Sequence, residues 1–176
     1  MAYPQEYINY LVHFHGDRDY FECHEELEEL WKQDPKEERK DHLVAFIQIA
    51  VALYHQRRGN FNGAYKMMSN AITIIEKKKE AVTHSGLHPA KLLTLLNDRL
   101  TDIENSVSYK SFNLPINDSK LVEVCKKKCE SLGLEWGSIR PVEDVNIIDK
   151  HKRRDRSDVI AEREKQKILK TKKRDD

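Results

Sequence analysis

The strongest constraint on the fold is an apolar stretch, LVAFIQIAVALYH, at residues 43–55. As a helix it would be apolar on nearly every side, whereas a surface helix of a globular protein is usually apolar along one stripe only. Such a helix has to be enclosed by other elements. It is also too short to cross a bilayer, which takes about 20 apolar residues. The stretch therefore predicts the central helix of a bundle, over residues 37–58, and no membrane contact.

The other periodic segments predict an all-α helical bundle of about five to six helices with a charged C-terminal extension. Apolar residues recur in these segments at helical spacing, and Gly, Pro, Asn or Asp separates one segment from the next. Gly59 suits the left-handed position after a helix, and we expect Asp17, Asn60 and Asp118 to be N-caps. Besides the central helix, the predicted helices cover residues 3–15, 18–33, 61–79, 90–107 and 119–132.

Composition divides the chain into three parts. We expect a helical core at residues 1–107, a connector with a short helix packed on that core at 108–144, and a basic tail, helical or disordered, at 145–176. From residue 150 onward, twelve Lys/Arg and six Asp/Glu give +6, while the rest, with 19 basic and 24 acidic residues, carries −5. A basic tail on an acidic body predicts contact with an anionic partner or with the body itself.

The cysteines and the N-terminus indicate a cytoplasmic protein. Three cysteines are an odd number, which argues against a disulfide framework and fits a reducing compartment. The first ten residues, MAYPQEYINY, lack the basic and apolar regions of a signal peptide. Cys125 and Cys129 would share one helix face, and we interpret them as free buried thiols rather than as a metal-binding pair.

The segment FECHEELEELWK, residues 21–32, has the most unusual chemistry. As a helix it is apolar on one side, while the opposite side carries Glu22, Glu25, Glu26 and Glu29. These four could form an acidic docking face, but we favour the interpretation as a solvated helix surface. Glu28 departs from this pattern, because it lies one turn beyond His24 at the margin of the apolar stripe. A carboxylate and an imidazole in that position must satisfy each other or serve a ligand.

The central helix directs two further polar residues toward this pair. Gln48 and His55 are seven residues apart, hence on one face, and would meet His24 and Glu28 if the two helices pack antiparallel. One interpretation is a closed hydrogen-bond network that locks the helices together. The other is a site in which His24, Glu28 and His55 bind a divalent metal, or His24 and Glu28 act as a general acid/base pair. The full predicted cluster comprises His24, Glu25, Glu28, Trp31, Gln48, His55 and Asn60.

These two helices together resemble an uncharacterised bacterial family, the domain-of-unknown-function family 309. The resemblance rests on Phe21, His24, Glu25, Glu28, Trp31, Gln48, Ala52, Tyr54, His55, Gly59, Asn60 and Ala64. It covers roughly residues 1–107, and the basic tail looks like that of longer Bacillus-type members. The resemblance implies an all-helical fold. It implies no reaction, because the family has no established activity.

Three classes of function stay open at this point. The leading hypothesis is a small cytoplasmic scaffold or adaptor that binds another protein, with the buried His/Glu/Gln cluster as a structural network. In that hypothesis the basic tail adds a candidate contact for nucleic acid. The first alternative is a metal-dependent or general acid/base enzyme centred on His24, Glu28 and His55. The second is a small-ligand sensor that uses the same cluster as its pocket.

Overall fold

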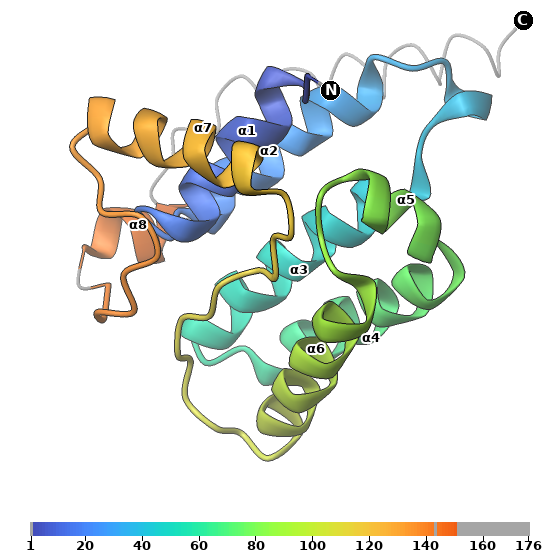
Figure 1. Cartoon of the computed structure of the whole chain (residues 1–176). Helices are drawn as coiled ribbons and strands as arrows, with labels where there is room; N and C mark the ends of the chain where they lie inside the picture. The colour runs from blue at the N-terminus through green and yellow to red at the C-terminus, as the bar shows by residue number, and fades with distance from the viewer. Residues whose placement is uncertain (1, 143, 151–176) are drawn as a thin grey trace, which may run out of the picture.

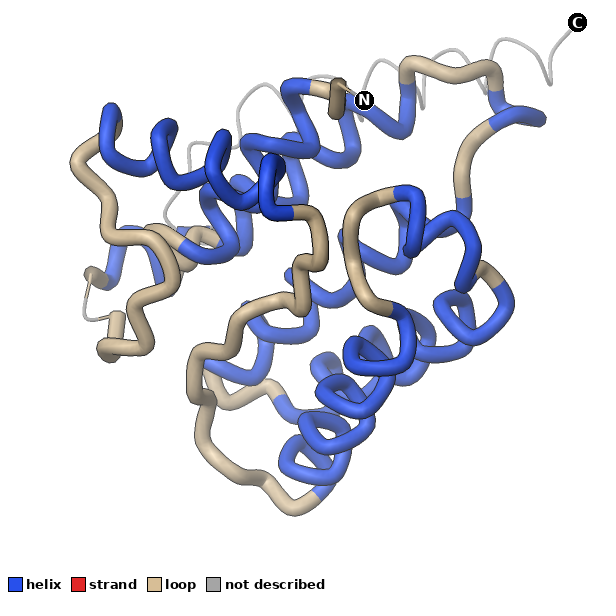
Figure 2. Tube along the Cα trace, in the orientation of Figure 1, coloured by secondary structure: helices blue, strands red, loops and turns tan. Residues whose placement is uncertain are grey.

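The structure of the chain is a computed structural model that describes residues 2–142 and 144–150. Its regular elements are helical, which confirms the predicted all-α bundle (Figures 1 and 2). None of the helices in this described part has both the length and the hydrophobicity needed to cross a membrane. The elements are α1 (Gln5–His15), α2 (Tyr20–Lys32), the 3₁₀ turn η1 (Lys36–Glu38), α3 (Asp41–Arg57), α4 (Phe61–Lys77), α5 (Lys79–His84), α6 (Pro89–Glu104), α7 (Ser119–Ser131) and α8 (Val145–Ile148).

Helix α3 is the centre of the bundle, as its apolar sequence predicts. It packs against α2 on one side and α4 on the other, α1 packs on α2, α6 packs on α4, and α7 packs on α1 (Figure 1). Phe46, Ile49 and Leu53 of α3 are completely buried. Burying a side chain of this size is worth about 1.5–3 kcal/mol relative to leaving it exposed. The packing of α3 therefore supplies much of the force that holds the neighbouring helices in place.

Most predicted helix boundaries agree with the structure to within a few residues, and two of the three predicted N-caps are confirmed. The side chain of Asn60 accepts a hydrogen bond from the backbone N–H of Gly63 at 3.1 Å, and Asp118 accepts from Leu121 at 3.3 Å. The helix predicted at 61–79 is divided at Lys78 into α4 and α5, which places Val82 of α5 in the core. The central helix begins at Asp41 rather than at residue 37, because η1 occupies part of the connection from α2.

The predicted cap of α2 was wrong. Asp19, not Asp17, accepts from the backbone N–H of Glu22, at 3.1 Å. The reason is the backbone of Arg18, whose φ of 57° lies in the left-handed region and delays the start of the helix. Asp17 instead accepts from the N–H of Asp19 at 3.2 Å and lies 3.1 Å from Nδ1 of His13.

The buried guanidinium of Arg18 ties the α1–α2 turn to two distant segments. Its side chain is 1% exposed. NH1 donates to the carbonyl of Phe112 at 2.7 Å, and NH2 donates to Oδ1 of Asn113 at 2.7 Å and to the carbonyl of Ser138 at 2.9 Å. The connector between α6 and α7 and the loop after α7 are thus both bonded to the first turn of the chain.

His15 makes a parallel set of contacts beside Arg18. The N–H of Leu114 donates to its Nε2 at 2.9 Å, so Nδ1 carries the proton, and Nδ1 donates to the carbonyl of Leu11 at 2.8 Å. Burial lowers the pKa of His15 to about 3, and the charge of nearby Arg18 acts in the same direction. Its ring stacks on Trp136 with the centroids 4.4 Å apart. Trp136 thus serves as the aromatic anchor through which the loop after α7 docks on α1.

We expect Arg18→Met to lower the free energy of unfolding by at least about 2 kcal/mol, because methionine keeps the apolar stem and removes hydrogen bonds from a charged donor. Urea unfolding followed by circular dichroism measures the change. Arg140→Met, at an exposed position on the loop after α7, is the matched control. Equal stability of the two variants would show that Arg18 does not hold the connector and the loop.

Candidate functional site

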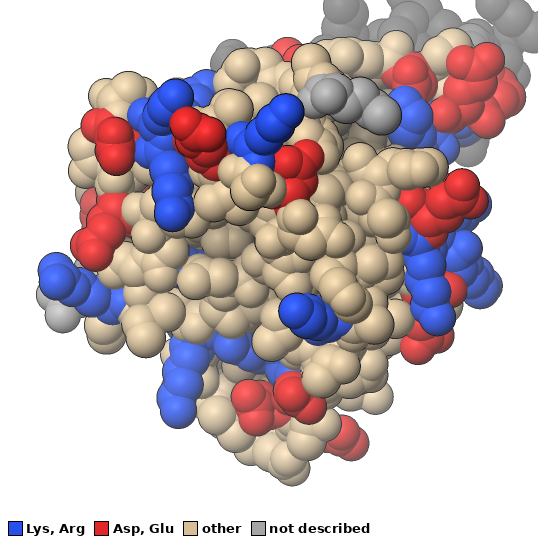
Figure 3. Space-filling model, in the orientation of Figure 1, with Lys and Arg blue, Asp and Glu red and all other residues tan. Residues whose placement is uncertain are grey.

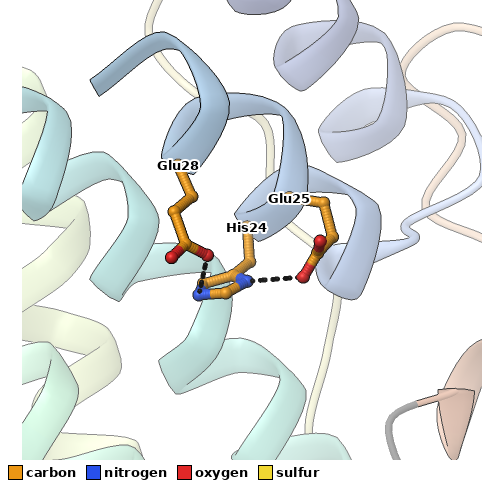
Figure 4. Close-up of side chains that lie close together, drawn as sticks. All are labelled: His24, Glu25 and Glu28. Atoms are coloured by element: carbon orange, nitrogen blue, oxygen red, sulfur yellow. Dashed lines mark hydrogen bonds and ion pairs between the residues drawn. The ribbon is translucent and has the colours of Figure 1, made fainter. Parts of the chain in front are cut away.

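Three residues of the predicted cluster come together on α2 (Figure 4). Nδ1 of His24 lies 3.2 Å from Oε1 of Glu25, and Nε2 lies 3.3 Å from Oε2 of Glu28. One ligand atom from each of the three residues lies within 4.8 Å of the other two. The pairing of His24 with Glu28 follows from their spacing of four residues, which places them one above the other on a helix.

The cluster lies at the edge of the bundle rather than inside it. The side chains of His24, Glu25 and Glu28 are 34%, 40% and 32% exposed. The buried stripe of α2 is instead formed by Tyr20, Cys23 and Leu27. Because His24 and Glu28 each follow one of these buried positions by a single residue, the helix turns them about 100° away from the core centre. The cluster was predicted to be buried, and its three side chains are instead only partly buried.

The charges in the cluster are mutually satisfied. Oε1 of Glu28 also pairs with Nζ of Lys32 at 2.8 Å. Partial burial would raise the pKa of Glu28, but the hydrogen bond from Lys32 and the charge of His24 outweigh it and hold that pKa below its usual value. The result is a continuous polar chain of Glu25, His24, Glu28 and Lys32 along one side of the helix.

The remaining members of the predicted cluster have other surroundings. Nδ1 of His55 lies 3.3 Å from Nδ2 of Asn60, at the turn between α3 and α4. Trp31 packs against the core with one ring face under the guanidinium of Arg39, 4.6 Å from the ring centroid. Within the described part of the chain, the buried Oε1 of Gln48 has no hydrogen-bond partner. The close group of ligand-type residues thus contains Glu25 where the metal hypothesis placed His55.

The geometry limits what a metal ion would find at this position. The two nitrogens of His24 face opposite carboxylates, so one ion can use only one of these faces. An ion at Nε2 would have Glu28 as its second ligand, with Glu25 orienting the ring from the other side. Zinc sites usually have three or four protein ligands. Lys32 also competes for the carboxylate of Glu28. An ion-pair network accounts for the arrangement with no ligand.

The second feature of α2 is a surface groove that its sequence pattern does not predict. Glu22, Glu25, Glu26, Glu28 and Glu29, which we call the acidic face, line a surface groove of about 380 Å³ together with Lys32. The sequence pattern places four of these residues on one side. It gives no signal that a lysine far along the chain lies against them.

Lys150 binds at one end of the acidic face. Its Nζ lies 2.8 Å from Oδ2 of Asp19 and 2.8 Å from Oε1 of Glu22. Burial alone would lower the pKa of Lys150, but the hydrogen bonds to these two carboxylates raise it above its usual value. The neighbouring Asp149 pairs with Nε of Arg58 at 2.9 Å. Two consecutive residues after α8 are thus held by ion pairs to the start of α2 and to the residue that follows α3.

The cysteines agree with the sequence interpretation. Cys23, Cys125 and Cys129 are free and buried. Burial raises the pKa of the Cys125 thiol to about 12 and that of Cys129 to about 11. Because the thiolate is the reactive and metal-binding form, these thiols are inert near neutral pH.

Comparison with known proteins establishes the family. The family model described as a domain of unknown function (DUF309) matches residues 7–67. The "Uncharacterized protein YpuF" of Bacillus subtilis (strain 168) is 49% identical over 173 residues, which cover 98% of this chain and 99% of that protein. The chain belongs to the DUF309 family. No solved structure matches it.

The DUF309 match extends from α1 to the first turns of α4 and includes the whole of α2. It therefore contains His24, Glu25, Glu28 and the acidic face. The groups that accept hydrogen bonds from Arg18 lie after the matched residues, in the part of the chain that YpuF also covers.

Because the cluster is partly exposed, we expect Glu28→Gln to change the free energy of unfolding by less than about 1 kcal/mol, with or without added zinc. Thermal melting in zinc and in a chelator measures this. Leu27→Ala, at a fully buried neighbour, should lose about 2–5 kcal/mol and is the control. A zinc-dependent rise in melting temperature that Glu28→Gln abolishes would overturn the network interpretation and support the metal hypothesis.

Proposed function

We propose that this DUF309 protein is a helical adaptor that binds a lysine- or arginine-rich segment of another protein on the acidic face of α2. The observation that carries the proposal is the position of Lys150, which the carboxylates of Asp19 and Glu22 hold from two sides. A basic partner would form ion pairs of the same kind with Glu25, Glu26 and Glu29 along the groove that they line.

The distribution of charge supports such a role. On the face drawn in Figure 3, Lys and Arg are mixed with Asp and Glu, and other residues cover much of the centre. The acidic face, by contrast, gathers five carboxylates around one groove, with Lys32 in its lining and Lys150 at one end. A concentration of one sign attracts a segment of the opposite sign and speeds its association, more strongly at low salt.

The pKa of Glu28 favours binding over acid/base catalysis. A general acid that works near neutral pH needs a raised pKa, whereas the pKa of Glu28 is lowered. An ionised carboxylate is instead suited to pairing with a cation. Each exposed pair contributes only about 0–1 kcal/mol, so useful affinity requires several pairs formed together.

The metal-dependent enzyme is the second candidate. It is favoured by the way Glu25 faces Nδ1 of His24, an arrangement that would orient Nε2 toward an ion beside Glu28. The zinc comparison with Glu28→Gln separates this candidate from the adaptor.

The hypothesis of a nucleic-acid contact depends on the basic tail, whose residues 151–176 lie outside the described part of the chain. It stays a proposal, as does the cytoplasmic location.

The proposal predicts salt-sensitive binding of a basic peptide. Fluorescence anisotropy with a labelled lysine-rich helical peptide should show at least about tenfold weaker binding when Glu22, Glu26 and Glu29 are all changed to Gln, because three carboxylates are lost from the face. The matched control changes Glu123 and Glu130, two exposed glutamates of α7, to Gln.

The chain's own tail has to be separated from an external partner. The measurement is therefore repeated with the chain ended after Lys150. Tighter peptide binding by this shortened chain would mean that the tail competes for the same face. Equal peptide affinity of the acidic-face variant and the α7 control would contradict the proposal in either form of the chain.

A further inference from the structure

A cavity of about 670 Å³ opens at the end of the bundle away from the α3–α4 turn. Its lining residues come from the beginning of α1, the end of α2, the beginning of α3 and the helix α5, whose positions in the bundle can be followed in Figure 1. Sites for small molecules in proteins have volumes of about 300–1,000 Å³. The cavity shares no residue with the acidic face, so it calls for an explanation of its own.

One wall of the cavity is apolar because its tyrosine hydroxyls are already used. The hydroxyl of Tyr7 donates to the carbonyl of Ser85 at 2.6 Å, and that of Tyr3 donates to Oδ2 of Asp118 at 2.6 Å. The two rings lie 5.9 Å apart and tilted by 41°. With Leu30 and Leu43 they form a surface that suits an aromatic or aliphatic group.

The opposite wall is polar and holds more cations than anions. Lys40 and Lys78 line it, and each has one carboxylate partner on an exposed pair, at 3.2 Å in Asp34 and 3.9 Å in Asp41. Arg39 adds a third cation. Pairs this exposed are weak and exchange readily with another anion.

His42 also lines the cavity. Its ring contacts Phe46 edge-on, with the centroids 5.7 Å apart. Among the residues that the structure describes, no hydrogen bond or ion pair to its imidazole is recorded. Burial lowers the pKa of His42, and the charges of Lys40 and Lys78 lower it further while Asp41 acts in the opposite direction. A neutral imidazole at this place offers one donor and one acceptor to a ligand.

We propose that this cavity binds a small amphipathic anion, in which an aromatic or aliphatic group is joined to a carboxylate or phosphate. The apolar group would lie on Tyr3, Tyr7, Leu30 and Leu43. The anionic group would meet Lys40, Lys78 and His42. The beginning of α3 opens into the same space and adds a positive potential to the one that the lysines provide.

The proposal is tested on the full chain with two probes of equal shape, phenylacetate and the neutral phenylacetamide. Chemical-shift changes of backbone amides locate and quantify the binding. We expect phenylacetate to bind with a Kd of about 1 mM, as is usual for a fragment of this size, and phenylacetamide to bind several-fold more weakly. Phenyl phosphate should bind at the same amides, and its affinity relative to phenylacetate shows which anionic group the site prefers.

Two variants connect the binding to the two walls. Changing Lys40 and Lys78 together to Gln should weaken the binding of phenylacetate several-fold, toward that of phenylacetamide, while Arg39 and the start of α3 remain. The weaker binding of phenylacetamide should be unchanged. Ala81→Trp, which fills the cavity from α5, should abolish the binding of both probes, with a melting curve confirming that the variant is folded. Equal binding of the acid and the amide by the natural chain would overturn the proposal, as would the absence of binding at about 10 mM.

Discussion

A guanidinium buried in the α1–α2 turn organises the way this turn meets the connector before α7 and the loop after it. Among the residues that the structure describes, no carboxylate pairs with Arg18, and its charge is met by the carbonyls of Phe112 and Ser138 and the amide oxygen of Asn113. Arg57 of α3 donates in turn to the carbonyl of Arg18 at 2.8 Å. A buried charge left without such acceptors is costly in free energy. The conformations of the turn, the connector and the loop are therefore stable only together.

The same turn determines where the acidic face begins. Because Arg18 adopts a left-handed backbone conformation, Asp19 becomes the N-cap of α2. While Oδ1 of Asp19 caps the helix, Oδ2 forms an ion pair with Lys150, which also pairs with Glu22. The start of α2 sets the angular position of every glutamate after it. At the far end of the helix, Leu30 reaches the apolar wall of the cavity. One helix thus presents a charged groove along its side and contributes to a separate cavity at its end.

Local patterns in the sequence were sufficient for the elements but not for their long-range contacts. The apolar stretch of α3, the caps at Asn60 and Asp118 and the pairing of His24 with Glu28 all depend on residues within one or two turns, so periodicity and spacing could predict them. The role of Arg18 could not be predicted, because its partners lie 94 to 120 residues away and two of them are backbone carbonyls. The same holds for Lys150, 131 residues after Asp19. The burial of His24 and Glu28 was overestimated. Helical spacing gives the angular position of a side chain around its own helix axis, but it does not show how far the neighbouring helix covers that side chain.

The most direct test of this account is an NMR titration of the His15 imidazole. We predict a neutral ring with its proton on Nδ1 from pH 8 down to about pH 4, because the folded pKa lies far below the usual 6.5. Because the unfolded chain binds the proton first, the contribution of His15 to stability should be nearly constant above about pH 7.5 and fall at lower pH, by about 2 kcal/mol between pH 7 and pH 5. A His15 ring that titrates near pH 6.5 in the folded protein would mean that it is open to water. The contacts that join His15, at the end of α1, to the segments around Leu114 and Trp136 would then not exist.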